Sequence, residues 1–590
     1  LDASNAITVD KPPASLWLMA LSVRLFGLGY VQILAPQVIL AGLTVLMLAR
    51  STRLMLALPT LKDDNHEQEY VIPTRWALWA SLAAAGIFAL SPVAALMFRY
   101  NNPDALLVTL MVAAVLATQH AIRASHRGGR VWPSLVAAGL ALGFGFLTKQ
   151  FQVLLITPAL VLAWVVSSRG VWWKKLVSLL WPVSSMVVSA GWWIALVELV
   201  PESMRPYVGG SQTNSFLELT FGYNGLGRLT GDEEGSVGGR QGGGWGETGI
   251  TRLFEDSFGS QIAWLLPAAL VLLVALTVWL LAGKRTRLAD ALAKSEAVGC
   301  NSLLRVGIIL WGGWLVVTWL TLSFMQGIVH EYYTVALTPA IAVLVATGTA
   351  VLYRGTRTWG TIVLALTVAL TGSFQYVLLA NFSVPSWFRW IVLIAGLIAG
   401  VLLVVRSLGI TFNKALAIAI ITTSLFAGLV APTVLTTATI AGKSSGSIIT
   451  IGGDLGSRMG GPGGGQGGPG GGMGSLLNGA SVGGEVEQLL VENADSYTWV
   501  AATTGSQSAA SYQLASEKPV MAIGGFNGTD PSPTLEEFQS YVEAGRIHYY
   551  IGGSQGGPAG ESGSASEIQQ WVEENYTAFE VDGVTIYDLA

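Results

Sequence analysis

Polar side chains that could do chemistry stand in a few short stretches between long apolar runs, and the first stretch is Asp10-Lys11-Pro12-Pro13. Two prolines stop a helix from running through, so the two charges are presented on a turn or at a helix start. A lysine placed there suits a phosphate as a point charge. The alternative is an ordinary interfacial lysine beside a helix cap.

The next two polar stretches are short turns. The stretch from Arg99 to Asp104 includes Asn102. It is either a contact surface or a capped turn with Asp104 near a helix N-terminus. Lys149 joins two apolar helices through a minimal turn, and its ammonium either extends to the membrane surface or faces an anionic ligand. These four residues are candidate site residues, Asp104 as a catalytic carboxylate beside Asp10.

A long polar stretch between 200 and 261 interleaves Gly, Asn, Tyr and Arg. Aromatic faces, amides and guanidinium groups suit sugars and phosphates, and a Gly-rich lid in solvent is the alternative. A further group stands at the mouth of a later helix, where aromatic residues of the membrane surface are the alternative. The candidate contacts in these two segments are Arg205, Tyr207, Asn214, Tyr223, Asn224 and Arg228, and then His330, Tyr332 and Tyr333.

The composition of the whole chain indicates a protein dissolved in lipid. Of its 590 residues 52% are hydrophobic and 12% charged, against roughly 25% charged residues in soluble proteins, and the mean hydropathy is +0.55. The net charge of −4 is too small to indicate a nucleic-acid partner. Cys300 is the single cysteine, which rules out an intrachain disulfide. Five histidines leave little material for a metal site, so we expect no metal ligands, although Asp10 and His330 could share a divalent ion.

Twelve segments are apolar enough to cross a membrane as helices. A bilayer core of about 30 Å needs about 20 mostly apolar residues, and lipid offers the backbone no hydrogen-bond partner. The segments lie at 32–50, 76–96, 104–121, 131–147, 151–167, 177–199, 262–282, 306–324, 333–353, 359–380, 388–405 and 414–433.

Basic residues mark one side of the membrane as cytoplasmic. One set of loops carries Arg50, Arg53, Arg123, Arg127, Arg130, Arg169, Lys174, Lys175, Lys284, Arg285, Arg287, Arg354, Arg357, Arg406 and Lys414. The other set, at 97–103, 325–332 and 381–387, holds Arg99 alone. We therefore expect the polar stretches and everything after 434 to lie outside.

The C-terminal part has a different composition. Residues 441–484 contain the run GGPGGGQGGPGGGMG, which cannot bury a core and is expected to be flexible. Helix patterns and strand-like runs then alternate, which predicts a small α/β domain with a largely parallel sheet. The helices are predicted at 486–493, 507–515, 534–544 and 565–574, and the strands at 497–502, 518–523, 547–551 and 583–588. The loop 524–530 follows a strand, where ligand contacts are common; a structural turn is the alternative.

The predicted organisation has four parts. They are a first outer loop at 1–31, a transmembrane domain at 32–433 with an outer loop at 200–261, a Gly-rich linker at 434–484, and an extracytoplasmic α/β domain at 485–590. Polar clusters on one face of an uncharged bundle indicate an interfacial active site, because a transporter places polar groups at mid-membrane and repeats its halves. A non-catalytic lipid-linked-sugar transporter or a glycan-binding envelope protein is the alternative.

Several long motifs resemble those of one bacterial family. The chain carries VDKPP, NNPDALL, RPYVGGS, FGYNGLGRLTG, HEYYTVALTP and KPVMAIGGFNGTDP. Together they resemble the YkcA/B-like mannosyltransferases of the GT-C superfamily, which also holds protein O-mannosyltransferases and aminoarabinose transferases. The resemblance spans nearly the whole chain.

The resemblance implies a GT-C-like helical bundle in the bacterial plasma membrane. It implies inverting transfer of a mannose-like hexose from a polyprenyl-phosphate donor to an envelope acceptor (a lipid, a glycan or a protein) on the outer face. An acidic residue of the first outer loop would be the general base, and cations would stabilise the leaving phosphate. Lys11 is the implied phosphate contact, with Arg205, Arg228, Tyr332 and Tyr333 as helpers.

The chain also departs from the family pattern. Members carry an Asp-Glu type motif soon after their first transmembrane helix, upstream of the VDKPP sequence, and this chain has neither the helix nor the motif. We therefore expect one more helix and the main base before Leu1. Asp10 and Asp104 would then be accessory, and the chain as given would bind its donor poorly or be inactive.

Overall fold

The computed structural model describes residues 4–56, 74–231, 246–282, 302–355, 358–408, 414–444, 446–455, 479–552 and 563–590. Several predictions fall on residues outside these ranges and are not tested. They concern the Gly-rich run, His66, Cys300, and the basic residues Lys284, Arg285, Arg287 and Arg357.

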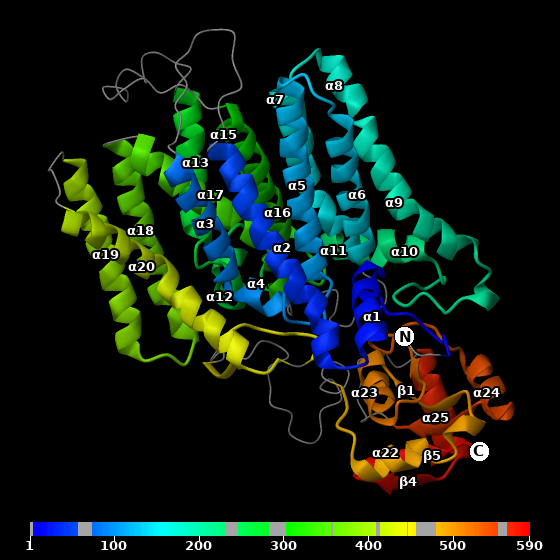
Figure 1. Cartoon of the computed structure of the whole chain (residues 1–590). Coiled ribbons are helices and arrows are strands. Elements are labelled where there is room, and N and C mark those ends of the chain that lie inside the picture. The colour runs from blue at the N-terminus through cyan, green and yellow to red at the C-terminus, as the bar shows by residue number, and fades with distance from the viewer. Residues whose placement is uncertain are drawn as a thin grey trace.

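Most of the described chain forms one bundle of apolar helices, with a small domain at one end (Figure 1). The bundle comprises α1 (Ala14–Phe26), α2 (Tyr30–Leu56), α3 (Thr74–Ala89), α4 (Pro92–Met97), α5 (Asp104–His126), α6 (Trp132–Lys149), α7 (Thr157–Ser167), α8 (Trp172–Ser178), α9 (Leu180–Leu199), α10 (Phe216–Phe221), α11 (Gly227–Thr230), α12 (Asp256–Ile262), α13 (Leu266–Ala282), α15 (Ser302–Gly307), α16 (Gly313–Phe324), α17 (Thr338–Gly355), α18 (Trp359–Leu378), α19 (Ser386–Ser407) and α20 (Lys414–Ala441). Short helical turns connect several of these helices.

The twelve segments predicted to span the membrane all lie in helical parts of the bundle, but the segment at 76–96 is divided between α3 and the short α4. Nine helical segments of the described residues are long and apolar enough to cross a membrane, and α3 and α13 are shorter apolar helices. The count falls below twelve partly because the segments at 131–147 and 151–167 form one continuous helical stretch, Trp132–Ser167. Its direction changes where Gln150 adopts a φ of 42°. The prediction of a multi-pass helical membrane protein is confirmed.

Small residues let the bundle helices approach each other closely, as is usual where lipid provides no hydrophobic driving force between helices. On α6, Gly143 faces α9 so tightly that an added Cβ would lie 1.9 Å from the Oγ of Ser189. Ser185, one turn earlier on α9, donates to the carbonyl of Val136 at 3.1 Å. This contact fixes α6, and therefore fixes the position of Lys149 at its C-terminal end.

The segment after the last bundle helix is partly ordered. Helix α20 continues to Ala441, beyond the predicted end at 433, and the described residues 446–455 pack back onto the bundle. Ile449 and Ile451 are buried in the core of the bundle, and the Tyr100 hydroxyl donates to the Gly446 carbonyl. At this end, then, the predicted linker is a packed strap.

The C-terminal domain is a five-stranded sheet covered by helices on both faces. Its strands are β1 (Trp499–Thr504), β2 (Val520–Ile523), β3 (Ile547–Ile551), β4 (Ala578–Val581) and β5 (Val584–Asp588), and its helices are α22 (Gly484–Val491), α23 (Ser506–Ser516), α24 (Leu535–Glu543) and α25 (Ser564–Asn575). Helices α22 and α23 share one hydrophobic core with the sheet, and α24 and α25 share the other. The predicted C-terminal α/β fold is confirmed.

The sheet is mixed, with the order β2-β1-β3-β5-β4. Strands β1, β2 and β3 are parallel and fully buried, whereas β5 runs antiparallel to β3 and to β4. The prediction of a largely parallel sheet therefore holds for these three strands only. It missed β4, which pairs with β5 through a two-residue turn in which Asp582 and Gly583 both have positive φ.

The N-terminal segment ties the C-terminal domain to the bundle. Ile7 is 1% exposed and belongs to the hydrophobic core of the C-terminal domain. It pairs in parallel with Tyr207, and the Thr8 amide donates to the Tyr207 carbonyl at 2.9 Å. The Ser4 hydroxyl donates to the Thr498 carbonyl at 3.0 Å. The segment that leads into Asp10 and Lys11 thus contacts both the helical bundle and the C-terminal domain.

Candidate active site

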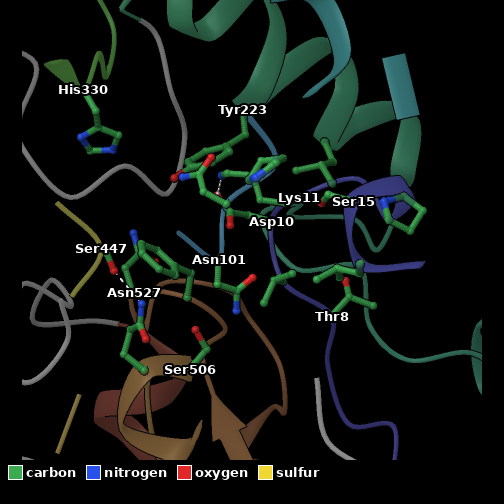
Figure 2. A pocket seen from close by; sticks show the side chains of 18 of the residues that line it. Thr8, Asp10, Lys11, Ser15, Asn101, Tyr223, His330, Ser447, Ser506 and Asn527 are labelled. Atoms are coloured by element: carbon green, nitrogen blue, oxygen red, sulfur yellow. Dashed lines mark hydrogen bonds and ion pairs between the residues drawn. The ribbon is translucent and has the colours of Figure 1, made fainter. Parts of the chain in front are cut away.

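A cavity of about 850 Å³ lies between the helical bundle and the C-terminal domain. This volume is in the upper part of the range of about 300–1,000 Å³ that small-molecule sites occupy. Figure 2 shows Asp10, Lys11, Tyr223 and His330 on one side of the cavity, and Ser447, Ser506 and Asn527 on the other. Asn102, Arg228, Tyr332 and Tyr333 also line it.

Asp10 and Lys11 form an ion pair at the wall of this cavity. The Asp10 side chain is 7% exposed and the Lys11 side chain 30% exposed. The Asn224 amide donates to the Asp10 carbonyl at 2.7 Å, and a Cβ added to Gly210 would lie 2.9 Å from the Cβ of Asp10. Burial lowers the pKa of Lys11 and nearby Arg228 lowers it further, while Asp10 opposes them. The turn is therefore held closely on the side of Asp10, and its lysine faces the cavity.

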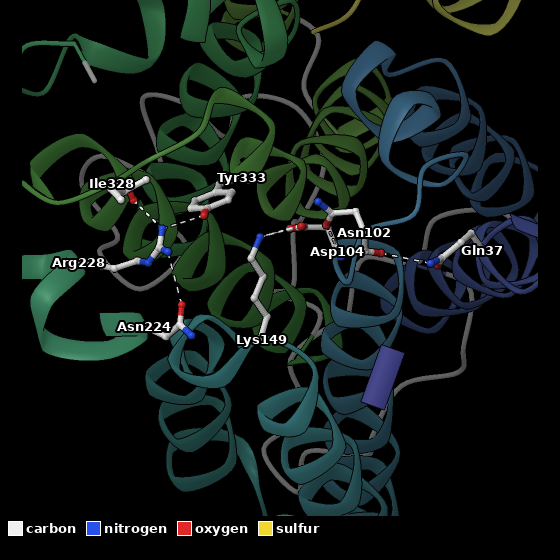
Figure 3. Close-up of polar contacts among 8 residues, drawn as sticks. All are labelled: Gln37, Asn102, Asp104, Lys149, Asn224, Arg228, Ile328 and Tyr333. Atoms are coloured by element: carbon white, nitrogen blue, oxygen red, sulfur yellow. Dashed lines mark hydrogen bonds and ion pairs between the residues drawn. The ribbon is translucent and has the colours of Figure 1, made fainter. Parts of the chain in front are cut away.

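Arg228 is the second cation of the site. It stands on the single-turn helix α11 and is 9% exposed. Its guanidinium donates to the Ile328 carbonyl at 3.0 Å and to the Tyr333 hydroxyl at 2.9 Å, and lies 3.5 Å from the Asn224 side-chain oxygen (Figure 3). These contacts hold the guanidinium at the wall of the cavity.

Lys149 and Asp104 form a second, more buried ion pair. The Lys149 ammonium lies 2.7 Å and 2.8 Å from the two carboxylate oxygens of Asp104 (Figure 3). The Asp104 side chain is fully buried and the Lys149 side chain is 11% exposed. The Asn102 side chain accepts from the Asp104 amide at 3.0 Å, and Asp104 is the first residue of α5, the position that the capped-turn alternative gave it. Asp104 lines neither this cavity nor the smaller one next to it.

Three rings from the end of the 325–333 loop pack together beside these cations. His330 stacks on Tyr332 at 5.2 Å and meets Tyr333 edge-on at 5.3 Å. The Lys149 ammonium lies 3.8 Å from the centre of the Tyr333 ring. Burial holds the pKa of His330 well below its ordinary value, and Arg228, Lys11 and Lys149 lower it further. His330 is therefore neutral at physiological pH and offers a hydrogen-bonding ring nitrogen without charge.

A smaller, mostly apolar cavity of about 190 Å³ adjoins the same cations. Lys11, Arg228 and Tyr333 line both cavities, and Lys149 and Asn224 line the smaller one. Its apolar lining consists of Phe151, Leu155, Leu229, Leu322 and Met325. The cations therefore stand between the large cavity, which holds the polar groups described above, and a smaller, mostly apolar one.

Four predicted contact residues lie away from both cavities and hold loops in place. Arg99 donates to the Thr439 carbonyl at 3.2 Å. Arg205 donates to the carbonyls of Val197 and Asn214. The Asn214 side chain accepts from the Val208 amide at 2.9 Å, and the Tyr207 hydroxyl donates to the Ser211 carbonyl at 2.8 Å. Their polar groups are used within the protein, so their prediction as substrate contacts is not supported.

Sequence reasoning missed most of the opposite wall of the large cavity. Ser506 and Gln507 begin α23, and Gln507 donates to the Ser447 hydroxyl at 2.6 Å. Phe526 and Asn527 belong to the loop 524–530, whose position after a strand had marked it as a possible ligand contact. No local pattern distinguishes Ser447, Ser506 or Gln507 from ordinary turn residues.

The described part of the chain contains no group of three or more His, Cys, Asp or Glu side chains that could hold a metal ion. Asp10 and His330 line the same cavity, but they have no third partner of this kind among the described residues. What the described site offers is a carboxylate, two cations at the cavity wall, an imidazole and several hydroxyl groups.

Two segments match known families. Residues 74–194 match the family described as "Dolichyl-phosphate-mannose-protein mannosyltransferase". Residues 486–575 match the family described as "Putative mannosyltransferase YkcB-like, C-terminal". The resemblance predicted from the motifs is therefore confirmed in both halves of the chain.

Similar proteins extend the match over the whole length. The chain is 28% identical to "Putative mannosyltransferase YkcB" of Bacillus subtilis (strain 168), over 97% of this chain and 84% of that protein. It is 27% identical to "Putative mannosyltransferase YycA" of the same organism, over 97% and 87%. Among solved structures, ArnT from Cupriavidus metallidurans bound to undecaprenyl phosphate is 16% identical, covers 99% of this chain and 89% of its own, and has a TM-score of 0.48.

Proposed function

We propose that this membrane glycosyltransferase transfers a hexose such as mannose from a polyprenyl-phosphate donor to a hydroxyl group of a cell-envelope acceptor. The observation that carries the proposal is the convergence of Asp10, Lys11 and Arg228 on one cavity, next to an apolar hollow. The family matched by residues 74–194 is named for dolichyl-phosphate mannose, a donor of this class, which supports the same assignment.

The donor phosphate is assigned to the two cations that face the cavity. The Lys11 ammonium contacts one phosphate oxygen as a point charge, and the planar Arg228 guanidinium contacts another. The polyprenyl chain occupies the hollow formed by Phe151, Leu155 and their apolar neighbours, which lies on the other side of the same cations. The sugar then extends into the large cavity.

The reaction is a single displacement at the anomeric carbon. The oxygen of the acceptor hydroxyl forms a bond to this carbon, while the bond from the carbon to the phosphate oxygen breaks and polyprenyl phosphate leaves with the electron pair. The configuration is inverted. Lys11 and Arg228 stabilise the charge that develops on the leaving phosphate, a contribution of roughly 10²–10³-fold for one well-placed donor.

Asp10 is proposed to take the proton of the acceptor hydroxyl. Within the described ranges it is the one carboxylate that lines the large cavity, whereas Asp104 is buried against Lys149. When the donor phosphate binds, Lys11 divides its charge between the phosphate and Asp10, which makes Asp10 a stronger base at the moment of transfer. The earlier expectation of a main base before Leu1, with Asp10 accessory, is untested and stays the competing prediction; a small effect of Asp10→Asn on kcat would favour it.

The cavity is proposed to open on the outer face of the membrane. The C-terminal domain lies at one end of the bundle, and α8 lies at the other end (Figure 1). Helix α8 carries Lys174 and Lys175. Since basic residues collect on the cytoplasmic side, the opposite end, with the cavity and the C-terminal domain, faces outward.

The proposal is tested with the full chain reconstituted in vesicles that contain radiolabelled polyprenyl-phosphate mannose. Lys11→Ala should lower transfer roughly 10²–10³-fold and weaken binding of undecaprenyl phosphate. Lys443 is exposed and lines neither cavity. Lys443→Ala is therefore the matched control, and it should leave transfer and binding of undecaprenyl phosphate unchanged. Equal binding of undecaprenyl phosphate by the wild type and Lys11→Ala would refute the assignment of the phosphate.

A further inference from the structure

We infer that the C-terminal domain forms the acceptor subsite of the cavity, and that Gln507 and Asn527, with Phe526 beside them, bind an uncharged saccharide there. This inference rests on the proposed function and names the substrate class for the part of the site that faces the donor. Nothing in the sequence marked these residues as a group, because they come from a helix start and a separate loop.

The cavity has two walls of different chemistry. The bundle wall carries the charged groups Asp10, Lys11 and Arg228. The wall from the C-terminal domain consists of Ser506, Gln507, Ala510, Phe526 and Asn527, so it carries hydroxyl, amide, methyl and aromatic groups and no charge. Figure 2 shows Ser506 and Asn527 across the cavity from Lys11 and Tyr223. A charged phosphate and an uncharged ligand would therefore each have a suitable side.

The uncharged wall is a fixed part of the cavity. The Gly210 amide donates to the Asp530 carboxylate at 2.9 Å, three residues after Asn527. Gln507 donates to Ser447 on the strap, and Tyr100 of the bundle holds Gly446 of the same strap. Ile7 of the N-terminal segment lies in the core of the C-terminal domain. With contacts at several points, the wall can present its groups in a constant geometry.

The chemistry of this wall suits sugar hydroxyl groups. Gln507 donates to Ser447 through its amide nitrogen, so its side-chain oxygen is the group that would accept from a sugar hydroxyl. The Asn527 side-chain oxygen accepts from the Thr529 hydroxyl at 2.6 Å, which holds this amide in the cavity wall. A half-buried aromatic ring such as Phe526 offers an apolar face to the C–H side of a sugar ring. Among the described residues, this wall offers no cation to a carboxylated or phosphorylated acceptor. The wall therefore favours an uncharged saccharide over an anionic one.

Gln507 has a second role that the test must separate. Its amide ties the C-terminal domain to Ser447, so Gln507→Ala could act through the strap alone. Ser447→Ala removes the same tie and leaves the amide in place. An effect that appears in Gln507→Ala and not in Ser447→Ala belongs to contact with the ligand.

The test is equilibrium binding of maltotriose, an uncharged trisaccharide, to the full chain in lipid nanodiscs saturated with undecaprenyl phosphate. Gln507→Ala and Asn527→Ala should each raise the Kd for maltotriose about threefold to tenfold, the value of one neutral hydrogen bond. Gln570 is exposed on α25, away from the cavity, so Gln570→Ala is the control. Binding of undecaprenyl phosphate should be unchanged in all of these variants.

The two probes keep this inference distinct from the proposed function. An unchanged Kd for maltotriose in Gln507→Ala and Asn527→Ala would overturn the inference while the Lys11-dependent binding of undecaprenyl phosphate stands. Tighter binding of maltotrionate, which carries a carboxylate, than of maltotriose would also overturn the inference. Binding of a serine-rich peptide by a protein that does not bind maltotriose would overturn it as well. Loss of Lys11 dependence would refute the proposed function, and the inference with it. Thermal unfolding of each variant checks that it is folded; Asn527→Gln, which keeps the amide, should recover part of the affinity.

Discussion

The site contains two aspartate–lysine pairs that differ in burial and in what they face. Asp104 and Lys149 come from α5 and α6, and both carboxylate oxygens contact the ammonium at 2.7 and 2.8 Å. Asp10 and Lys11 are neighbours in sequence, and their lysine is 30% exposed towards the cavity. The first pair connects two helices, and the second stands where a ligand would bind.

This difference shows why residue type alone does not identify a catalytic group. A fully paired, buried carboxylate has its charge compensated and has no access to a substrate, so Asp104 is a structural connection. Asp10 has the same chemistry but lines a space large enough for a sugar. We therefore propose that the first pair contributes stability and that the second takes part in the reaction.

The largest expected effect comes from breaking the buried pair. Lys149→Met leaves the Asp104 carboxylate buried without a partner, which costs about 3–5 kcal/mol of folding free energy. The double variant Asp104→Asn/Lys149→Met, which buries no charge, should recover most of that loss. Thermal unfolding followed by size-exclusion chromatography measures both. If Lys149→Met were as stable as the wild type, the claim that the Asp104–Lys149 pair stabilises the fold would be wrong.

An effect of similar size, on the rate rather than on stability, is expected at the exposed pair. Asp10→Asn should lower kcat roughly 10²–10⁴-fold, the usual contribution of a general base, with a melting temperature close to that of the wild type. Binding of undecaprenyl phosphate should persist, because Lys11 and Arg228 are intact. The measurement is transfer from radiolabelled polyprenyl-phosphate mannose next to a binding assay. A kcat within a few-fold of the wild type would mean that another group takes the proton.

The smallest effect is a pH dependence of donor binding at the exposed pair. Burial lowers the pKa of Lys11 below its ordinary value of 10.5, so Lys11 loses its charge at a lower pH than an exposed lysine. Affinity for undecaprenyl phosphate should therefore fall as the pH rises through this lowered pKa. Lys11→Arg, whose guanidinium stays charged, should bind without that fall. Identical alkaline profiles for the wild type and Lys11→Arg would contradict the assignment.

Much of the fold could be predicted from the sequence, because long apolar runs leave few structures other than membrane helices. The hairpin of β4 and β5 was missed although its turn residues, Asp582 and Gly583, are a recognised signal. The error came from reading alternation of helix and strand as a parallel sheet to the end of the chain. The last strand pair has no helix between its members.

The site was predictable only in part. Asp10, Lys11, Asn224 and Arg228 stood out as polar groups among apolar neighbours. Arg205 stood out in the same way, yet its guanidinium binds backbone carbonyls within its own loop and in the preceding helix. Sequence does not show which polar groups are used internally. The wall from the C-terminal domain was hidden for another reason: its contact with the bundle joins residues 320 positions apart, a separation that leaves no local pattern.

Because Ile7 is buried in the core of the C-terminal domain, the N-terminal segment can complete its packing only after that domain has been synthesised. Ser4 contacts Thr498 across 494 positions. Thr8 and Asp10 have partners at Tyr207 and Asn224, but Ser4 and Ile7 lack their partners in the C-terminal domain until almost the whole chain has been translated. Such distant contacts form late in folding. A ribosome-bound bundle therefore lacks an assembled site, and a chain that stops before the C-terminal domain exposes Ile7, an apolar residue that cellular quality control can recognise.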